Sequence, residues 1–345
     1  MTKRKDYIDT AKFWAIFLLF IEHSQLFANF TGYYKYLKIW ICSCHMALFF
    51  ITFGMVASDS RITSKKDAVN FVNKRYRGLM VPYFLWSFIY ASSLNGKAFA
   101  GILYGTNPSL GYACTNSVFW FLPAMFCATI LFQILVNIGY YFETKREIVF
   151  GIELMVCSAI SLLLKSMRPN MGFVWGIDIS FTGVVLMLIG LLLRPLIDKM
   201  YELKKSKILS LSLVCLLIGG LCAQFNTPDE SWVSIMALAY YGKSYWGFII
   251  LAVISSLGII GGSMLLEKCR LFTWLGRNSL LLMTLHFVIL SRLVTLCQKY
   301  FGVLNMAVAI LCATICMAIC VPLVYLINKF APVLKGKEYC TVKDR

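Results

Sequence analysis

Residues 7–24 read YIDTAKFWAIFLLFIEHS, an apolar stretch long enough for a helix that enters a lipid bilayer. It nevertheless carries Asp9 and Lys12 near its start and Glu22 and His23 near its end. Lys12 and His23 are eleven residues apart, about three turns, so they project from the same face of a helix. Their separation along the axis is about 16 Å, roughly half of a ~30 Å hydrocarbon core. Ionisable residues at membrane depth mark a functional site by default, so this stretch predicts both a membrane helix and a site.

The composition of the chain indicates its class. Hydrophobic residues make up 59% of the 345 residues and charged residues 14%, and the mean hydropathy is +0.74. This balance is foreign to soluble globular domains. No polar segment is long enough for a soluble domain, so we expect one transmembrane domain over 1–345. The basic start resembles the n-region of a signal peptide, but no small-residue cleavage site follows it, and we expect an uncleaved first span.

Apolar runs predict ten membrane-spanning helices, each long enough to cross a bilayer. Polar residues interrupt the second run, and the third and fifth runs are short. The predicted spans are 12–30, 38–57, 79–95, 118–139, 148–164, 172–193, 208–225, 246–266, 278–298 and 306–328. The predicted fold class is therefore an all-α integral membrane protein with about ten transmembrane helices.

The distribution of Lys and Arg orients these spans. With a cytoplasmic N-terminus, the inner segments hold 25 of the 33 Lys and Arg residues, as the positive-inside rule requires. These inner segments are 1–12, 58–78, 140–147, 194–207, 267–277 and a basic tail over 329–345. We therefore expect both termini in the cytoplasm. The net charge of +17 then reports mainly topology, and no folded basic face is expected that would bind nucleic acid.

The 13 cysteines lie mostly inside apolar runs and form no CxxC pair. Cys42 and Cys44 with His45 place three soft ligands within four residues. At the edge of a span this pattern is more typical of packing than of metal binding, so we expect no metal site.

Two further polar stretches lie at the edges of predicted spans. His45 stands in an aromatic-rich part of the second span, where interhelical packing and a site role fit the pattern equally well. Lys74, Arg75 and Arg77 precede the third span at its inner edge. Such a cluster either orients a span or binds a phosphate-bearing ligand.

The remaining polar residues stand singly. Asp178 opens the sixth span as a lone carboxylate, and Glu153 in the fifth span is expected to hydrogen-bond a neighbouring helix or to be protonated. Ser279 leads into His286 in the ninth span. All three histidines of the chain therefore lie in a span or at its edge. A neutral imidazole is less costly there than a lysine, so one histidine alone is also compatible with a hydrogen bond in the core.

In their order and spacing these motifs resemble the membrane-bound acyltransferase 3 family, whose members transfer acyl groups, typically acetyl, to bacterial surface sugars. The resemblance runs from about residue 6 to 328. Asp9-x-x-Lys12 through His23 is similar to the family's Asp-x-x-Arg/Lys…His first helix. The other motifs are His45-Met46 with Phe49-Phe50 and Gly54, Lys74-Arg75 and Arg77 before Pro82-Tyr83-Phe84, Trp120-Phe121-Leu122, Ile177-Asp178 with Gly183 and Gly190, and Gly276-Arg277-Asn278-Ser279 leading to His286. One departure is Glu22, which stands where glycine is frequent in the family.

The resemblance implies an O-acyltransferase, in particular an O-acetyltransferase of the sugar O-acetylase-like branch, in the cytoplasmic membrane of a bacterium. Its donor substrate would be cytoplasmic acyl-CoA, typically acetyl-CoA, with Lys74, Arg75 and Arg77 on the nucleotide phosphates. No tightly bound cofactor is expected. The acceptor would be a hydroxyl of a surface polysaccharide or of a lipid-linked sugar.

The resemblance also implies roles on the first helix. His23 would act as general base on the acceptor hydroxyl, Lys12 would be its companion, and Glu22 or Asp9 would hold or polarise it. Direct transfer to the sugar and a covalent acyl-histidine are both compatible with the motifs. The other site candidates are His45, Trp120, Asp178, Ser279 and His286.

Two alternatives come from other classes of protein. A transporter of a small anionic metabolite would also have many spans with charges near the midplane, although no inverted pair of broken helices is visible here. A non-catalytic membrane scaffold would leave both the charged first helix and the basic cluster at 74–77 unexplained.

Overall fold

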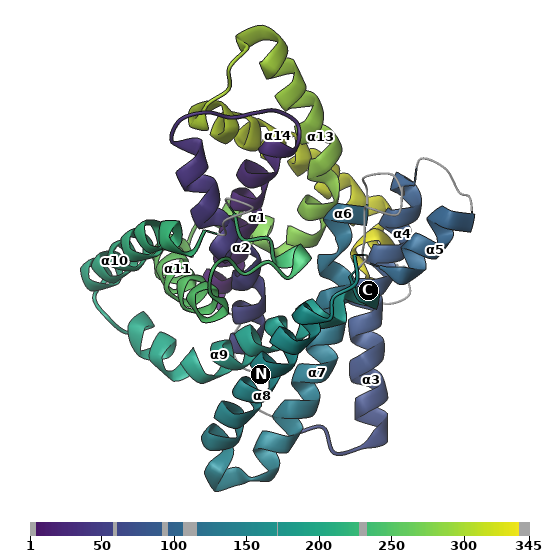
Figure 1. Cartoon of the computed structure of the whole chain (residues 1–345), viewed down its shortest axis with the longest axis vertical. Helices are drawn as coiled ribbons and strands as arrows, with labels where there is room; N and C mark the ends of the chain where they lie inside the picture. Colours follow the sequence, from purple (N-terminus) through teal and green to yellow (C-terminus); the bar gives the residue numbers. More distant parts are fainter. Residues whose placement is uncertain are drawn as a thin grey trace. The chain divides into compact units, whose positions relative to one another are not determined.

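The computed structural model describes residues 5–57, 61–91, 96–105, 116–170, 172–227 and 233–337 (Figure 1). These residues are almost entirely helical, with two isolated β-bridges and no strand among them. The chain divides into two compact units. Unit 1 comprises Met1–Met55, Leu193–Met236 and Tyr240–Val324, and unit 2 comprises Val56–Leu192, Ala237–Ala239 and Tyr325–Arg345.

Unit 1 is organised around α1 (Asp6–His23), the helix with the ionisable residues. α1 packs against α11, α12 and α13. α10 lies along α11, as Figure 1 shows. Most of α1 is buried, and Ala11 and Ala15 are the small residues among its larger buried apolar side chains. The other helices of the unit are α2 (Tyr34–Val56), α10 (Lys205–Ala223), α11 (Tyr245–Leu266), α12 (Arg270–Arg277), α13 (Ser279–Phe301) and most of α14 (Met306–Phe330).

The first helix begins and ends earlier than the predicted span 12–30. It covers residues 6–23 and is followed by a short 3₁₀ turn, Ser24–Leu26. The last carbonyl groups of a helix lack partners within it, and inside a membrane they need others. Tyr34 supplies one, because its hydroxyl donates to the carbonyl oxygens of Ile21 at 2.8 Å and Glu22 at 3.2 Å. These bonds allow α1 to end well before residue 30.

The first helical segment of unit 2, residues 65–90, consists of two α-helices joined by a π-helix. α3 (Lys65–Arg75) leads into a π-helix, η2 (Tyr76–Met80), and then into α4 (Val81–Tyr90). The described part of the predicted third span 79–95 is thus the end of the π-helix followed by the ten-residue α4, while 92–95 lie outside the described residues. The rest of the unit contains α5 (Gly96–Tyr104), α6 (Asn116–Phe119), α7 (Phe121–Tyr141), α8 (Arg146–Ser166), most of α9 (Ile177–Tyr201) and a 3₁₀ turn, η8 (Pro332–Lys335).

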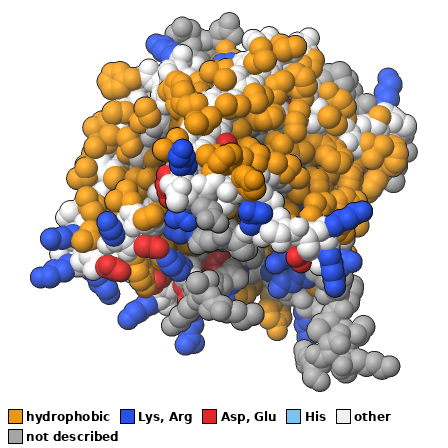
Figure 2. All heavy atoms as spheres, turned by 90° about the horizontal axis from the view of Figure 1, so that it is seen from below, with side chains coloured by type: hydrophobic (Ala, Val, Ile, Leu, Met, Phe, Trp, Pro, Cys, Tyr) orange, Lys and Arg blue, Asp and Glu red, His pale blue; other side chains and the backbone are white. Residues whose placement is uncertain are grey.

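Eight helices of the described chain are long and apolar enough to cross a membrane by length and composition. They coincide with eight of the ten predicted spans; the other two correspond to α1, which carries several charges, and to the short α4. The eight are Tyr34–Val56, Phe121–Tyr141, Arg146–Ser166, Val174–Tyr201, Lys205–Asn226, Tyr245–Leu266, Ser279–Phe301 and Met306–Phe330. Apolar side chains are also widely exposed on the face drawn in Figure 2, as a lipid environment requires. The protein is therefore an all-α integral membrane protein, as the hydropathy predicts.

In unit 1, contacts between loops join segments that the charge distribution places on the same side of the membrane. Predicted inner segments meet at one end, and predicted outer segments meet at the other. The inner contacts are the ion pair of Lys5 with Asp198 and the hydrogen bond from the Tyr201 hydroxyl to Glu267 at 2.9 Å. The outer contacts are Thr31 N to Leu304 O at 3.0 Å and Gln224 Nε2 to Tyr36 O at 3.3 Å.

Unit 2 shows the same sorting within itself. On the predicted inner side, the backbone N–H of Ile62 donates to Asn137 Oδ1 at 3.0 Å, and the Arg61 guanidinium lies 5.5 Å from the Tyr141 ring centroid. On the predicted outer side, the Tyr104 hydroxyl donates to the Gly172 carbonyl oxygen at 2.8 Å. Each unit therefore agrees with the predicted alternation of sides along the chain. Which of the two sides faces the cytoplasm is predicted by the distribution of Lys and Arg.

Candidate active site

A polar cluster at the C-terminal end of α1 centres on the ring of His23. Its Nδ1 atom lies 2.8 Å from Nε2 of His286, which belongs to the interior of α13. His286 is fully buried, and its Nδ1 atom lies 2.6 Å from the carbonyl oxygen of Met283. The ring of Phe20 stacks on the ring of His286 with centroids 4.9 Å apart. The two histidines, far apart in the sequence, thus form one hydrogen-bonded pair among apolar side chains.

A carboxylate and an ammonium group flank this pair on its other side. Oε2 of Glu22 lies 3.3 Å from Nε2 of His23, and Oε1 of Glu22 lies 3.4 Å from Nζ of Lys38. All three side chains are largely buried, with 13%, 17% and 9% of the Glu22, His23 and Lys38 side chains exposed. Burial strengthens these electrostatic contacts relative to those at a wet surface.

Lys38 is not among the residues that the sequence motifs single out, because it lies at the outer edge of the second span, outside the predicted inner segments. A signal for it exists in the sequence. Lys38 and His45 are seven residues apart, two helical turns, and therefore share a face of α2.

His45 is buried in α2, and its Nδ1 atom lies 2.7 Å from the carbonyl oxygen of Ile41 one turn earlier. The neighbouring Cys44 is also buried and bonds the carbonyl oxygen of Trp40 at 3.4 Å. Among the described residues, no group of three or more His, Cys, Asp or Glu side chains is placed to hold a metal ion.

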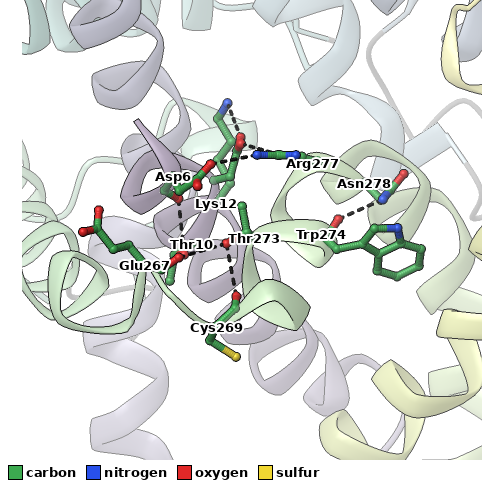
Figure 3. A network of polar contacts seen from close by, with 10 residues as sticks. Asp6, Thr10, Lys12, Glu267, Cys269, Thr273, Trp274, Arg277 and Asn278 are labelled. Carbon is green, nitrogen blue, oxygen red and sulfur yellow. Dashed lines mark hydrogen bonds and ion pairs between the residues drawn. The ribbon is translucent and has the colours of Figure 1, made fainter. Parts of the chain in front are cut away.

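A second polar cluster lies near the N-terminal end of α1, where Figure 3 shows Asp6 and Lys12 beside Arg277. Asp9 belongs to this cluster and is 2% exposed. Arg277, at the end of α12, donates from Nε to Asp9 Oδ2 at 3.0 Å and from a terminal nitrogen to Asp6 Oδ1 at 2.7 Å. Nζ of Lys12 lies 3.7 Å from Oδ1 of Asp9. The arginine thus bridges two carboxylates one turn apart on α1, and this bridge ties α12 to α1.

Gly276 makes this bridge possible. A Cβ atom built on it would lie 1.7 Å from the carbonyl oxygen of Asp9, so any side chain here would collide with the backbone of α1. The next residue but one, Asn278, donates from its amide to the carbonyl oxygen of Trp274 at 2.8 Å (Figure 3). The Gly276-Arg277-Asn278 motif therefore acts locally by allowing a close approach, forming an ion pair and ending α12.

The four predicted catalytic residues of the first helix belong to two different clusters. Glu22 and His23 lie together, whereas Asp9 and Lys12 lie with Arg277. α1 is unbroken between them, so Lys12 and His23 remain about 16 Å apart along its axis. The structure does not bring Lys12 into contact with His23, although both project from one face.

The basic cluster predicted to bind acyl-CoA lies at the junction of α3 and η2 in unit 2. Lys74 and Arg77 are exposed, and the half-buried Arg75 has its guanidinium 5.0 Å from the ring centroid of Phe71. Burial lowers the pKa of Arg75, but a guanidinium keeps its charge at neutral pH. Arg77 stands in the π-helix, and such turns are frequent at functional sites.

The C-terminal segment supports this junction. A Cβ atom on Gly336 would lie 2.3 Å from the carbonyl oxygen of Arg77, so the two backbones are in close contact. One turn into α4, the indole N–H of Trp86 donates to the carbonyl oxygen of Leu334 at 3.0 Å.

The remaining site candidates are Asp178, Trp120 and Ser279. Asp178 is 1% exposed and forms an ion pair with Arg168, whose guanidinium also donates to the carbonyl oxygen of Ala237 at 3.0 Å. Trp120 precedes α7, with its ring centroid 6.0 Å from that of Phe121, and Ser279 begins α13.

Glu153 in α8 is 8% exposed, and neither carboxyl oxygen has a hydrogen-bond partner among the described residues. The predicted hydrogen bond to a neighbouring helix is therefore not formed within the described chain. Of the two alternatives for Glu153, the neutral, protonated carboxyl is the one compatible with this environment.

The fold and the first helix together define a multi-pass membrane protein with ionisable side chains buried between its helices. A family model described as an acyltransferase domain matches residues 5–327. The chain therefore belongs to the acyltransferase 3 family, as the motifs predict, and is an acyltransferase. Comparisons with curated proteins and with solved structures find no match.

Proposed function

We propose that the protein moves an acyl group, typically acetyl, from cytoplasmic acyl-CoA to a hydroxyl of a surface polysaccharide or of a lipid-linked sugar. We assign the general base to His23. The observation that carries this assignment is the arrangement around its ring, where one nitrogen bonds His286 and the other faces Glu22. A general base must be held in place by a neighbouring group while one nitrogen stays able to take a proton, and this arrangement supports both.

The chemistry balances with His23 acting first as base and then as acid. His23 takes the proton of the acceptor hydroxyl while that oxygen attacks the thioester carbonyl. The carbon–sulfur bond then breaks, and the CoA sulfur leaves with the proton that His23 returns. The products are the ester and free CoA thiol. Glu22 stabilises the imidazolium that exists between the two proton transfers.

The donor's phosphates are assigned to the exposed cations of the basic cluster, Lys74 and Arg77, with Arg75 beside them. Phosphates form strong charge-assisted hydrogen bonds with such side chains. Asp9 supports the transfer by holding α12 against α1 through its ion pair with Arg277, and Lys12 is a second cation beside this carboxylate. The location that fits a cytoplasmic donor and a surface acceptor is the cytoplasmic membrane of a bacterium.

The test measures release of CoA thiol by purified protein in detergent. The substrates are acetyl-CoA and an oligosaccharide prepared from the cell envelope, with no gradient present. His23→Gln keeps a donor and an acceptor but takes up no proton near neutral pH. We expect this variant to bind acetyl-CoA and to melt as the wild type does, while transfer falls about 10²–10⁴-fold. Wild-type transfer by His23→Gln would refute the assignment of the base.

The same assay distinguishes an acyltransferase from a transporter of a small anionic metabolite. A transporter releases no thiol from acetyl-CoA in detergent and shows its activity only as uptake into sealed vesicles.

A further inference from the structure

The hydrogen bond between His286 and Met283 determines which ring nitrogen of His286 carries a proton. A carbonyl oxygen only accepts, so Nδ1 of His286 donates to Met283 O across 2.6 Å. A neutral imidazole has a single ring proton. Nε2 of His286 therefore has none and accepts a hydrogen bond.

His23 must therefore carry the hydrogen atom of the hydrogen bond between the two histidine rings. Its Nδ1 atom donates to Nε2 of His286 across 2.8 Å, which leaves Nε2 of neutral His23 without a proton. We infer that His286 is a positioning residue that fixes this tautomer of His23, so that Nε2 of His23 is the nitrogen that accepts the proton from the acceptor hydroxyl. This inference rests on the proposed function, because it names the atom through which His23 acts.

The opposite arrangement would need a charged His286 that donates from both nitrogens. His286 is 0% exposed, and within the described part of the chain its ring lies near the Phe20, Phe287 and His23 rings and the backbone of Leu282 and Met283. None of these is a carboxylate, and an uncompensated buried charge is costly. The carboxylate of this cluster, Glu22, lies on the far side of His23. The neutral form of His286 is the one that its surroundings stabilise.

Glu22 explains why His23 needs this fixation. Lys38 beside Glu22 favours the ionised carboxylate, which accepts hydrogen bonds but donates none. Without His286, the Glu22 carboxylate would favour the tautomer of His23 that is protonated at Nε2. That tautomer cannot accept a proton at Nε2. With His286 in place, Nε2 and the carboxylate are two acceptors that face each other at 3.3 Å. A proton that arrives at Nε2 relieves this mismatch, so the cluster is prepared for proton uptake.

The tautomer can be observed directly, because the chain contains only three histidines. Protein labelled with ¹⁵N at its histidines is prepared in detergent at neutral pH, and the His23 signals are assigned by their loss in His23→Gln. We expect the wild-type signals of His23 to show a protonated Nδ1 and an unprotonated Nε2. In His286→Phe the signals should shift towards a protonated Nε2. A protonated Nε2 in neutral His23 of the wild type overturns the inference.

Activity provides a second readout that separates positioning from packing. His286→Phe keeps an aromatic ring against Phe20 but removes the acceptor, whereas His286→Gln offers a carbonyl oxygen to Nδ1 of His23. Loss of the productive tautomer in a catalytic triad costs about 10⁴-fold in kcat, and we expect roughly 10- to 10³-fold for His286→Phe. His286→Gln should recover part of this loss. A packing role predicts the reverse order, because Phe preserves the stack better than Gln.

The matched control is Thr284→Val on the same helix. Thr284 is also buried, and its hydroxyl donates to the carbonyl oxygen of Leu281 at 3.0 Å. We expect this variant to keep the His23 signals and kcat of the wild type. Equal kcat for wild type, His286→Phe and His286→Gln, with unchanged His23 signals, overturns the inference while leaving His23 as base. A fully active His23→Gln instead refutes the proposed function, whatever the spectra show.

Discussion

Nε of Arg277 lies 3.0 Å from Oδ2 of Asp9, although 268 positions separate these residues in the chain. The two partners differ sharply in exposure, because 44% of the arginine side chain is exposed and 2% of the aspartate. The exposed partner thus reaches in to compensate a carboxylate that is enclosed between α1 and α12. The ion pair therefore contributes to stability mainly by preventing an uncompensated charge.

Arg277→Gln should lower the stability of the protein more than it changes the chemistry. The glutamine removes the positive charge and leaves Lys12 as the cation next to Asp9. We expect a loss of about 1–3 kcal/mol, the cost of leaving a buried polar group poorly paired. The measurement is the thermal midpoint in detergent. Asp9→Asn in the same background should restore part of the loss, and an unchanged midpoint in Arg277→Gln would show that the pair contributes nothing.

Gly276→Ala should separate α1 from α12. The added methyl group would meet the carbonyl oxygen of Asp9 at 1.7 Å, and a backbone atom has no rotamer to escape. Alanine gains up to about 1 kcal/mol in helix propensity, but the collision outweighs this gain and we expect a net loss of about 1–3 kcal/mol. The control is Gly262→Ala in α11, where an added Cβ has no atom within 4 Å. Equal thermal midpoints for the two variants would contradict the predicted contact.

Glu22→Gln should reduce transfer without reducing affinity for acyl-CoA. The amide no longer stabilises an imidazolium at His23, and Lys38 loses the carboxylate at 3.4 Å. We expect kcat to fall about 10- to 100-fold, as for partners that orient or polarise a reactive group. The measurements are kcat and the apparent Kd for acetyl-CoA. Adding Lys38→Met should recover thermal stability but not kcat, because it removes the positive charge that faced Glu22 but does not restore the carboxylate beside His23. A wild-type kcat in Glu22→Gln would remove the carboxylate from the mechanism.

Arg75→Ala and Arg77→Ala should each weaken the binding of acyl-CoA. Both cations lie where helix α3 meets η2, and each charge-assisted bond to a phosphate is worth about 1.5–3 kcal/mol. The apparent Kd of detergent-purified protein for acetyl-CoA should therefore rise roughly tenfold or more, since 1.4 kcal/mol is a factor of ten. Lys66→Ala, another exposed cation of α3, is the control and should leave the Kd unchanged. An unchanged Kd together with lost expression would mean that the cluster serves only topology.

A reporter fused after Arg345 should report a cytoplasmic location. The expectation rests on the 25 Lys and Arg residues of the predicted inner segments against eight elsewhere. An enzyme that is active only outside the cytoplasm should give no signal in this position, and a cytoplasmic fluorescent reporter should be bright. A companion fusion within 226–245 is expected to give the opposite pair of results. Signal from the outside reporter after Arg345 would reverse the orientation.

The sequence by itself determined the class of the protein, eight of its spans and its family. Hydropathy and the Lys and Arg count are sums over local composition, so they need no knowledge of what packs against each helix. The same holds for motifs such as Asp9-x-x-Lys12 and Gly276-Arg277-Asn278. Residue type and spacing also singled out His23, His45 and His286 before any contact between them was known.

Only the tertiary structure decided which of these residues meet. Helical periodicity states that Lys12 and His23 share a face, but a helix face 16 Å long contacts different neighbours at its two ends. Lys12 therefore lies with Asp9, whereas His23 lies with His286 across 263 positions of sequence. The early end of α1 likewise depends on a distant hydroxyl, that of Tyr34, which satisfies its last carbonyl groups. Such pairings arise from helix packing, and no local pattern encodes them.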